Sequence, residues 1–477
     1  MGFKPTPEQM APVELAASGH NLIVSAYAGT GKSTTLGFIA DKLSNKKILY
    51  VTFGKENIIS ARKKFPDNVS CLTAHSIAYR YMDKKISMMK NDLLISNLGV
   101  SDILHVMGAG NTKSWDEREW DITQATRVVN VIACFCKSID MQITTGHLEP
   151  SEHPPSKQEA SQVVQIARKY WDLAYKGKVR LTHDMYLKMW HVSKPALPYD
   201  VILFDEAQDA DLLMIDVVMR QDAQIIAVGD THQQIYSFRG AVNALPRFNI
   251  ERKTELTQSF RYGQRTAALA NDLLYKHKGI NPGIRGNPRL RTQVERFYRP
   301  HNVIIGRTVK SLFKEMFAMQ EGGFEDFACL GDNKGMMEVL FAISALRSGK
   351  QVRHPFISTF NSFEEFQVYC KHSQNEAIPT YDAIRKKHGL KPVIGLLKRL
   401  GSSRKNKVVL LTAHKCKGLE FDDVTLLDDF TNIDHKSWNE EETNLAYVAA
   451  TRAMQTLNIG GCTVFDGIGV TRRSKYG

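Results

Sequence analysis

Cysteine, long apolar runs and repeats are all scarce in this sequence, and each scarcity excludes a class of protein. The chain has seven cysteines among 477 residues, an odd number without the spacing of a zinc site, so we interpret them as reduced thiols. No apolar run approaches the length that spans a membrane, and Met1-Gly2-Phe3-Lys4-Pro5 lacks an apolar signal core. No short repeat or low-complexity tract is present. We therefore expect a soluble protein of the cytoplasm, or of the nucleus in a eukaryote.

Positive charge, in contrast, is abundant. Lysine and arginine total 63 against 50 aspartates and glutamates, which gives a formal net charge of +13. This balance predicts affinity for polyanions, with nucleic acid the first candidate and an anionic membrane surface the second. The hydrophobic share of 43% and the charged share of 24% are ordinary for globular proteins, but 477 residues exceed the usual length of one domain. Several domains are therefore expected.

A glycine-rich turn follows the apolar run Leu22-Ile23-Val24 and precedes a helix-like segment from Thr35 to Leu43. The turn is Ala28-Gly29-Thr30-Gly31-Lys32-Ser33-Thr34. In a strand, glycine turn and helix of this kind, backbone N–H groups point at phosphate oxygens, the lysine reaches the β and γ phosphates and the serine ligates Mg²⁺. A nucleoside triphosphate is therefore the expected ligand. Ala26 replaces the first glycine of the general pattern, and an ordinary glycine turn is the alternative interpretation.

Two acidic residues follow another run typical of a buried strand. The run Val201-Ile202-Leu203-Phe204 ends in Asp205 and Glu206, which places two carboxylates at the carboxyl end of a strand, where open α/β sheets bind ligands. We expect Asp205 to hold the Mg²⁺ shell and Glu206 to orient and deprotonate the attacking water. A solvated acidic turn is the alternative, which the glycine-rich turn upstream makes the weaker one.

Short apolar runs rich in β-branched residues recur between helical patterns, which predicts parallel sheets. One group of runs lies near residues 22, 48, 201 and 225 and carries the glycine-rich turn and the acidic pair. The other group lies near residues 303, 408 and 424 and has no such turn. The predicted fold is therefore α/β, with two similar parallel-sheet lobes that are each interrupted by a helix-rich insertion.

Further short motifs are spread over nearly the whole chain. They are Thr6-Pro7-Glu8-Gln9, Tyr50-Val51-Thr52-Phe53, Thr73-Ala74-His75-Ser76, Val228-Gly229-Asp230 running to Arg239-Gly240-Ala241, Gln258-Ser259-Phe260-Arg261, Thr412 to Phe421, and Tyr447-Val448-Ala449-Ala450-Thr451-Arg452. The order and the chemistry of these motifs resemble those of the superfamily 1 DNA helicases of the UvrD and Rep type. Ala26-Tyr27-Ala28 and Leu427-Asp428-Asp429-Phe430 resemble the F-box DNA helicase branch, although no F-box-like extension precedes them.

The resemblance implies two RecA-like lobes with an ATP cleft between them. The predicted division is residues 1–78 and 195–250 for the first lobe, 79–194 for its helical insertion, 251–310 and 400–477 for the second lobe, and 311–399 for a second insertion. This second insertion is short for a Rep-type accessory domain. We therefore expect a reduced version, in which Ser358-Thr359-Phe360 and Phe363-Glu364-Glu365-Phe366 serve packing rather than catalysis.

For the base and sugar of ATP, the resemblance implies three residues. Gln9 resembles the glutamine that recognises the adenine edge, for which an amide offers both a donor and an acceptor. Phe260 resembles the aromatic residue that stacks on adenine, and Glu420 resembles the carboxylate that meets the ribose. A phenylalanine alone is more often a core residue.

The resemblance implies that the chain binds ATP and Mg²⁺. It also implies three residues that contact the phosphates of ATP. Gln233 resembles the γ-phosphate sensor, which loses its hydrogen bond after hydrolysis. Arg261 and Arg452 resemble the two arginines that reach in from the second lobe and neutralise charge on the transferring phosphoryl group. An arginine alone is usually a solvated or ion-paired surface group.

For the nucleic acid, the resemblance implies a groove across both lobes that does not distinguish sequences. Phe53, Tyr236 and Phe238 match positions where family members place stacking side chains. The residues that match backbone contacts, or lie near them in the motifs, are His75, Arg239, Thr412 and His414. A histidine alone is more often structural. Thr231 and His232 stand where many UvrD-type members carry acidic residues, which leaves the local metal or water contacts open.

The sequence thus predicts an ATP-dependent DNA helicase that moves 3′ to 5′ on single-stranded DNA and unwinds duplex DNA, without a membrane partner. The direction rests on the resemblance of residues 236–241 and 414–421 to the strand-gripping motifs of the UvrD side. Three alternatives stay open: a translocase that strips proteins from DNA, an RNA helicase, and a non-enzymatic ATP-gated DNA-binding module. The sequence does not distinguish roles in replication, repair and recombination.

Overall fold

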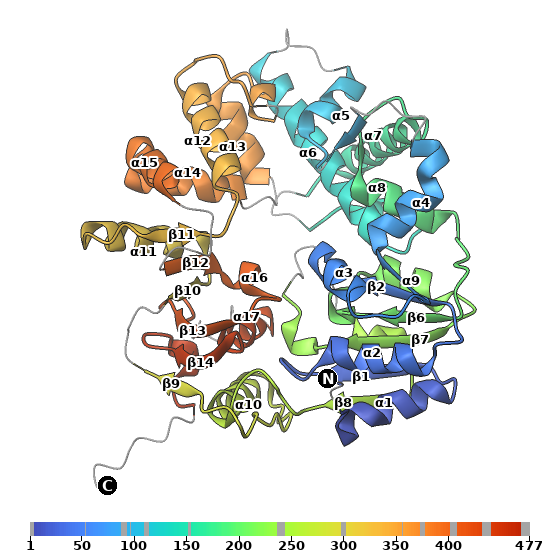
Figure 1. The fold of residues 1–477 in the computed structure, drawn as a ribbon. Helices are drawn as coiled ribbons and strands as arrows, with labels where there is room; N and C mark the ends of the chain where they lie inside the picture. Colours follow the sequence, from blue (N-terminus) through green and yellow to red (C-terminus); the bar gives the residue numbers. More distant parts are fainter. Residues whose placement is uncertain are drawn as a thin grey trace.

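The computed structural model describes residues 4–52, 54–86, 93–95, 97–108, 114–150, 154–235, 244–296, 302–354, 356–372, 377–400, 408–431 and 440–468. Four of the residues predicted to contact DNA lie outside the described residues, namely Phe53, Tyr236, Phe238 and Arg239. The described segments build two six-stranded sheets, which lie side by side in Figure 1 with helical regions above them.

The first sheet is parallel throughout, in the strand order β3-β2-β6-β7-β1-β8. Its central strands β2 and β6 are buried along their whole length, because helices cover both faces. The strands are β1 (Leu22–Ala26), β2 (Ile48–Thr52), β3 (Val69–Thr73), β6 (Val201–Phe204), β7 (Gln224–Gly229) and β8 (Lys253–Leu256). One face packs against α1 (Pro7–Ala17), α2 (Lys32–Lys42) and α3 (Lys55–Arg62), and the other face packs against α9 (Leu212–Met219).

The second sheet is also parallel, in the order β11-β12-β10-β13-β14-β9. Its strands are β9 (Gln293–Glu295), β10 (Val303–Gly306), β11 (Phe327–Cys329), β12 (Val408–Thr412), β13 (Phe421–Leu426) and β14 (Ala453–Asn458). The helices of this lobe are α10 (Gln264–Lys278), α11 (Val309–Glu321), α16 (Ala413–Cys416) and α17 (Glu440–Ala450). The two groups of apolar runs in the sequence thus form two separate sheets, which confirms the predicted fold class.

Two edge strands lie across the division expected from the sequence. The predicted boundary at residue 250 places β8 in the second lobe, but this strand pairs with β1 in the first sheet. β11 falls in the range 311–399 of the second insertion, but it pairs with β12 in the second sheet. Both strands are short, and Leu256 is the one buried residue of β8. Their apolar patterns are therefore too short to show to which lobe each strand belongs. Hydrogen bonds to a neighbouring strand determine in which sheet each one lies.

The helices of the insertions and the short elements complete the fold. The first insertion contains α4 (Ala74–Ile86), α5 (Val100–Met107), α6 (Trp115–Lys137), α7 (Lys157–Tyr175) and α8 (His183–Val192), with β4 (Leu94–Ile95) paired to β5 (Leu181–Thr182). The second contains α12 (Asn333–Arg347), α13 (Phe363–His372), α14 (Ala377–His388) and α15 (Leu390–Arg399). The short 3-10 turns are η2 (Thr145–His147), η3 (Ala207–Asp209), η4 (Thr231–Gln233), η6 (Leu245–Phe248), η7 (Ile357–Thr359) and η8 (Thr463–Phe465).

The two insertions touch each other where α6 meets α13 (Figure 1). Phe360 and Phe366 of the second insertion are buried in the same apolar cluster as the helices of the first, which agrees with a packing role. Within this contact, Arg118 of α6 donates from Nε to Oε1 of Glu365 at 3.3 Å, and both side chains are buried. Glu365 also accepts from the backbone N–H of Asn361 at 2.7 Å.

Two further observations agree with the sequence. None of the described helices combines the length and the apolar character that crossing a bilayer would need. All seven cysteines lie in the described segments and carry free thiols, as expected.

Candidate functional site

The glycine-rich turn joins β1 to α2 and needs glycine at two positions. Gly29 and Gly31 have positive φ angles of 76° and 80°, a region that other residues rarely adopt. A Cβ atom on Gly29 would also lie 2.6 Å from Oγ of Ser259 and 2.7 Å from Cβ of Arg261. Ala26, where the general pattern has glycine, is the last residue of β1 and has an ordinary extended place in the sheet. The turn therefore keeps the form of a phosphate cradle without the first glycine.

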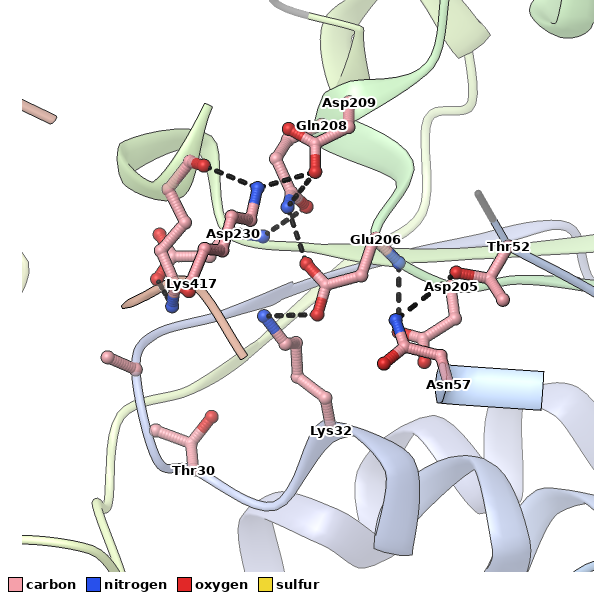
Figure 2. Close-up of polar contacts among 12 residues, drawn as sticks. Thr30, Lys32, Thr52, Asn57, Asp205, Glu206, Gln208, Asp209, Asp230 and Lys417 are labelled. Atoms are coloured by element: carbon pink, nitrogen blue, oxygen red, sulfur yellow. Dashed lines mark hydrogen bonds and ion pairs between the residues drawn. The ribbon is translucent and has the colours of Figure 1, made fainter. Parts of the chain in front are cut away.

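Lys32 of the turn is the first residue of α2 and points at the acidic pair that follows β6 (Figure 2). Its Nζ lies 3.5 Å from Oε1 of Glu206. Oε2 of Glu206 accepts from Nε2 of Gln208 at 2.6 Å. Oδ1 of Asp205 accepts from the backbone N–H of Glu206 at 2.9 Å. The predicted lysine and the two predicted carboxylates are thus brought together at the ends of two strands of one sheet.

Burial and charge act differently on the two carboxylates. Burial raises the pKa of Asp205, and the charge of Glu206 adds to this rise. Burial would also raise the pKa of Glu206, but the nearby Lys32 and Lys417 outweigh it and hold that pKa below its usual value. Glu206 is therefore ionised at neutral pH, with a lysine beside it.

Ser33, the predicted metal ligand of the turn, faces the same space as the carboxylates. Ser33, Asp205 and Glu206 line one cavity of about 60 Å³. Hydroxyl and carboxylate oxygens are the ligands that Mg²⁺ prefers, and Mg²⁺ usually keeps several waters, for which this volume has room. The donor set therefore fits a hydrated Mg²⁺ ion. Of the other residues of the turn, Thr30 donates its hydroxyl to the carbonyl of Tyr27 at 2.8 Å.

The predicted arginines come from the second lobe and converge on the same region. Arg452 is buried at the end of α17, and its guanidinium donates to Oε1 of Gln233 in the first lobe at 3.4 Å. Gln233 in turn donates from Nε2 to Asp230 at 2.7 Å. Arg261 donates from Nε to Glu420 at 2.8 Å. Arg452 and Gln233 therefore already meet across the lobes, while Glu420 contacts Arg261.

A lysine of the second lobe makes a second bridge between the lobes (Figure 2). Lys417 lies in the loop after α16, and its Nζ is 2.5 Å from Oδ2 of Asp209 in the first lobe. The same ammonium donates to the backbone carbonyl of Gln233 at 2.7 Å. Because Asp209 follows the acidic pair within one turn, Lys417 places a positive charge from the second lobe beside the predicted catalytic carboxylates.

Tyr447 of α17 makes a third bridge, directly to the glycine-rich turn. Its hydroxyl oxygen accepts from the backbone N–H of Ala28 at 3.0 Å and donates to Oδ2 of Asp230 at 3.2 Å. His232, which replaces an expected acidic residue, stacks on Tyr27 with ring centroids 5.9 Å apart. The turn is thus contacted by both lobes.

The residues predicted for adenine lie together at the other end of the turn. A Cβ atom on Gly31 would lie 3.1 Å from Nε2 of Gln9 and 3.6 Å from the ring of Phe260. Oε1 of Gln9 accepts from the backbone N–H of Thr6 at 3.0 Å, which orients the amide. Phe260 is 44% exposed, although its backbone N–H donates to the carbonyl of Gly29 at 2.8 Å. An exposed ring beside an oriented amide is suited to stacking and edge recognition of a base.

Three of the residues predicted to contact DNA are described. His75 is the second residue of α4, directly after β3, and its Nε2 lies 3.2 Å from Oδ1 of Asp184 in the first insertion. Thr412 ends β12 of the second lobe, and His414 lies in α16 directly after it. His75 follows the carboxyl end of β3 in the first sheet, and Thr412 ends β12 in the second sheet. Their contact with DNA stays a prediction.

The family follows from comparison with known proteins. Residues 6–248 match the model of the UvrD/REP helicase N-terminal domain, which is more than half of the chain, and residues 365–463 match that of the UvrD-like helicase C-terminal domain. The chain belongs to the UvrD/REP helicase family. The resemblance found in the short motifs is thereby confirmed.

Two curated relatives of this UvrD/REP helicase carry F-box DNA helicase names. The F-box DNA helicase protein 1 of Schizosaccharomyces pombe is 32% identical, over 95% of this chain and 57% of its own length. The F-box DNA helicase 1 of Gallus gallus is 29% identical, over 92% of this chain and 47% of its own length. The resemblance to the F-box branch is therefore confirmed, and the chain spans about half the length of these relatives.

Solved helicase structures are more distant. The Arterivirus nonstructural protein 10 (helicase) has 11% sequence identity and a TM-score of 0.35, over 94% of this chain and 61% of its own. The PRRSV helicase has 12% identity and a TM-score of 0.34, over 95% of this chain and 54% of its own. Likenesses of this size carry no argument about the site.

The sequence predicts no role for several residues of the site, among them Tyr50, Lys417 and Tyr447 and the carboxylates Asp209 and Asp230. Tyr50, Lys417 and Tyr447 each lie within one of the short motifs, and a polar side chain in an otherwise apolar strand is a signal for Tyr50. Their partners, however, are distant in sequence and depend on strand register or on the contact between lobes. Neither could be obtained from local patterns.

Proposed function

We propose that the chain is an ATP-dependent DNA helicase that moves 3′ to 5′ on single-stranded DNA and unwinds duplex DNA. The observation that carries this proposal is the meeting of Arg452 and Lys417 from the second lobe with Gln233 and Asp209 from the first, beside Lys32. A site made from two lobes changes shape when its ligand is hydrolysed, so it can couple hydrolysis to movement. The names of the F-box relatives support DNA as the substrate.

The chemistry of the proposed site follows from its charges. Mg²⁺ held near Ser33 and Asp205 would neutralise charge on the phosphate oxygens. Lys32, which is 3.5 Å from Glu206, would turn toward a phosphate and leave that carboxylate. Loss of the nearest cation makes Glu206 more basic, so that it can accept a proton from the attacking water. Arg452 and Arg261 would stabilise the charge that develops on the transferred group.

Gln233 is the proposed coupling residue, because its amide contacts both lobes. Its oxygen accepts from Arg452 of the second lobe, and its nitrogen donates to Asp230 of the first. A terminal phosphate that binds this amide, and leaves after hydrolysis, changes the contact with Arg452 and therefore the contact between the lobes. Alternate closing and opening would then move a strand held by residues of both lobes, among them His75, Thr412 and His414.

Strand displacement on two partial duplexes tests the proposal. The substrates carry a single-stranded tail at the 3′ end or at the 5′ end, and Glu206→Gln serves as the matched control that keeps the shape of the side chain and loses the base. We expect displacement from the 3′-tailed substrate with ATP, little from the 5′-tailed one, and none with the control. Retained hydrolysis in Glu206→Gln would contradict its role as the base.

The same assay distinguishes the alternatives. A requirement for the 5′ tail would contradict the direction and leave the proposed ATP site intact. DNA-stimulated hydrolysis without displacement would favour the translocase, and comparable stimulation by RNA would favour the RNA helicase. Binding of ATP and DNA without any hydrolysis would favour the non-enzymatic module.

A further inference from the structure

Tyr50 stands next to the acidic pair because of strand register. β2 and β6 are parallel neighbours, and Tyr50 lies opposite Leu203. Side chains alternate between the two faces of a strand, so Asp205, two residues beyond Leu203, follows on the same face as Tyr50. A tyrosine at this diagonal position is long enough to reach the carboxylate.

The contact that results is short and enclosed. The hydroxyl of Tyr50 donates to Oδ2 of Asp205 at 2.6 Å, and both residues are buried. The ring of Tyr50 packs against Phe65 with centroids 4.9 Å apart. Since Oδ1 of Asp205 accepts from the N–H of Glu206, each carboxylate oxygen has one fixed donor. The orientation of Asp205 is therefore set from both sides.

The same residues border the cavity that fits a hydrated cation. Tyr50, Asp205 and Ser33 all line this space of about 60 Å³. The other polar residues of its lining are Glu206, Asn57, Ser60 and Lys64. The free lone pairs of a carboxylate held by two donors have a fixed direction. Ions that require near-ideal octahedral geometry, as Mg²⁺ does, depend on such ligand orientation.

We propose that Tyr50 is a positioning residue for Mg²⁺, whose hydroxyl holds the Asp205 carboxylate in the orientation that supports the metal and its waters. The proposal rests on the proposed function, because it takes Asp205 to be a metal-binding residue. It adds a residue that does not touch the nucleotide or the metal itself. It also explains why this position has a hydroxyl group, which the packing of the ring alone would not need.

The test is Tyr50→Phe, which keeps the ring and removes only the hydroxyl. The measurement is binding of ADP to the full chain by calorimetry over a series of Mg²⁺ concentrations, and again with EDTA. Loss of an outer hydrogen bond to a metal ligand typically weakens metal affinity by about 10- to 100-fold. We therefore expect the Mg²⁺ concentration at half effect to rise by about tenfold or more, with ADP binding in EDTA unchanged.

Tyr170→Phe is the matched control, because it also removes a buried hydroxyl hydrogen bond, to the carbonyl of Arg180 at 2.8 Å in the first insertion. It is expected to lower the melting temperature without changing the Mg²⁺ dependence. An unchanged Mg²⁺ dependence in Tyr50→Phe would overturn the proposal. If that variant does not fold, Phe65→Leu, which loosens the ring and keeps the hydroxyl, should raise the half-effect concentration, and no rise would overturn it.

Failure of the proposed function has a different signature. If ADP binding by the unmodified chain does not respond to Mg²⁺ at all, the metal site itself is absent and both proposals are overturned. If the unmodified chain responds and Tyr50→Phe responds equally, the role of Tyr50 alone is wrong.

Discussion

Lys188 in α8 is a cation held inside the first insertion. Its Nζ donates to the carbonyl of Ser138 at 2.6 Å and lies 4.6 Å from the ring centre of Phe135. Burial lowers the pKa of Lys188 from its usual 10.5 to about 8. Between these two values the unfolded chain binds a proton that the folded chain lacks, so this residue makes the free energy of unfolding rise with pH.

The prediction concerns the difference in the free energy of unfolding between the unmodified chain and Lys188→Met. Urea unfolding at pH 8 and pH 10 should show that the unmodified chain gains stability relative to the variant as the pH rises. Comparing the two proteins at each pH cancels the titration of all other groups. A difference that stays constant, or falls, would contradict the lowered pKa.

The sequence predicts those residues of the site that lie together in one short stretch of the chain. Lys32 and Ser33 follow a strand and a glycine turn in one continuous stretch, and the acidic pair follows its strand directly, so short patterns contain them. The bond from Tyr50 to Asp205 depends on which strands become neighbours, and that of Lys417 to Asp209 depends on how two lobes meet. No local pattern holds that information.

The contact between α6 and α13 contains a buried ion pair. Arg118 and Glu365 are 6% and 3% exposed, and removal of one partner from such a pair typically costs about 3–5 kcal/mol, because the other charge stays buried alone. We expect Arg118→Met to lower the melting temperature clearly. The double variant with Glu365→Met should recover part of the loss, since no unpaired charge remains.

Thermal unfolding of the unmodified chain, both single variants and the double variant measures this coupling. A double variant that melts no higher than the less stable single variant would contradict it. A matched control is the exposed pair of Lys334 and Glu338 in α12, whose removal should change the melting temperature little.

At the scale of elements, the sequence predicts most of the strands inside each sheet, but it misses β14 and assigns two edge strands to the wrong segments. Central strands such as β2 and β6 are covered on both faces and therefore appear as continuous apolar runs. β8 and β11 are short, and hydrogen bonds to one neighbour place them in their sheets. Edge strands are therefore the part of the division into lobes that pattern alone does not determine.

The charge of the whole molecule predicts how DNA binding responds to salt. With a net charge of +13, contacts to the strand should be mainly to phosphates, which release counterions on binding. A grip on about five phosphates implies a fall in affinity of about 100-fold between 50 and 200 mM salt. Fluorescence anisotropy with a labelled single strand measures this slope. A flat profile would indicate that the positive charge faces something other than nucleic acid.

The meeting of α6 and α13 gives the molecule the mechanics of a closed linkage. The lobes are joined at the bridges of Lys417, Tyr447 and Arg452, and the insertions that they carry are joined again at the top (Figure 1). Two rigid bodies connected at two places lose degrees of freedom that a single hinge would leave. Any rotation of one lobe against the other must therefore shift or break the contact between α6 and α13. A rearrangement of the lobes around a phosphate thus also moves the two insertions against each other.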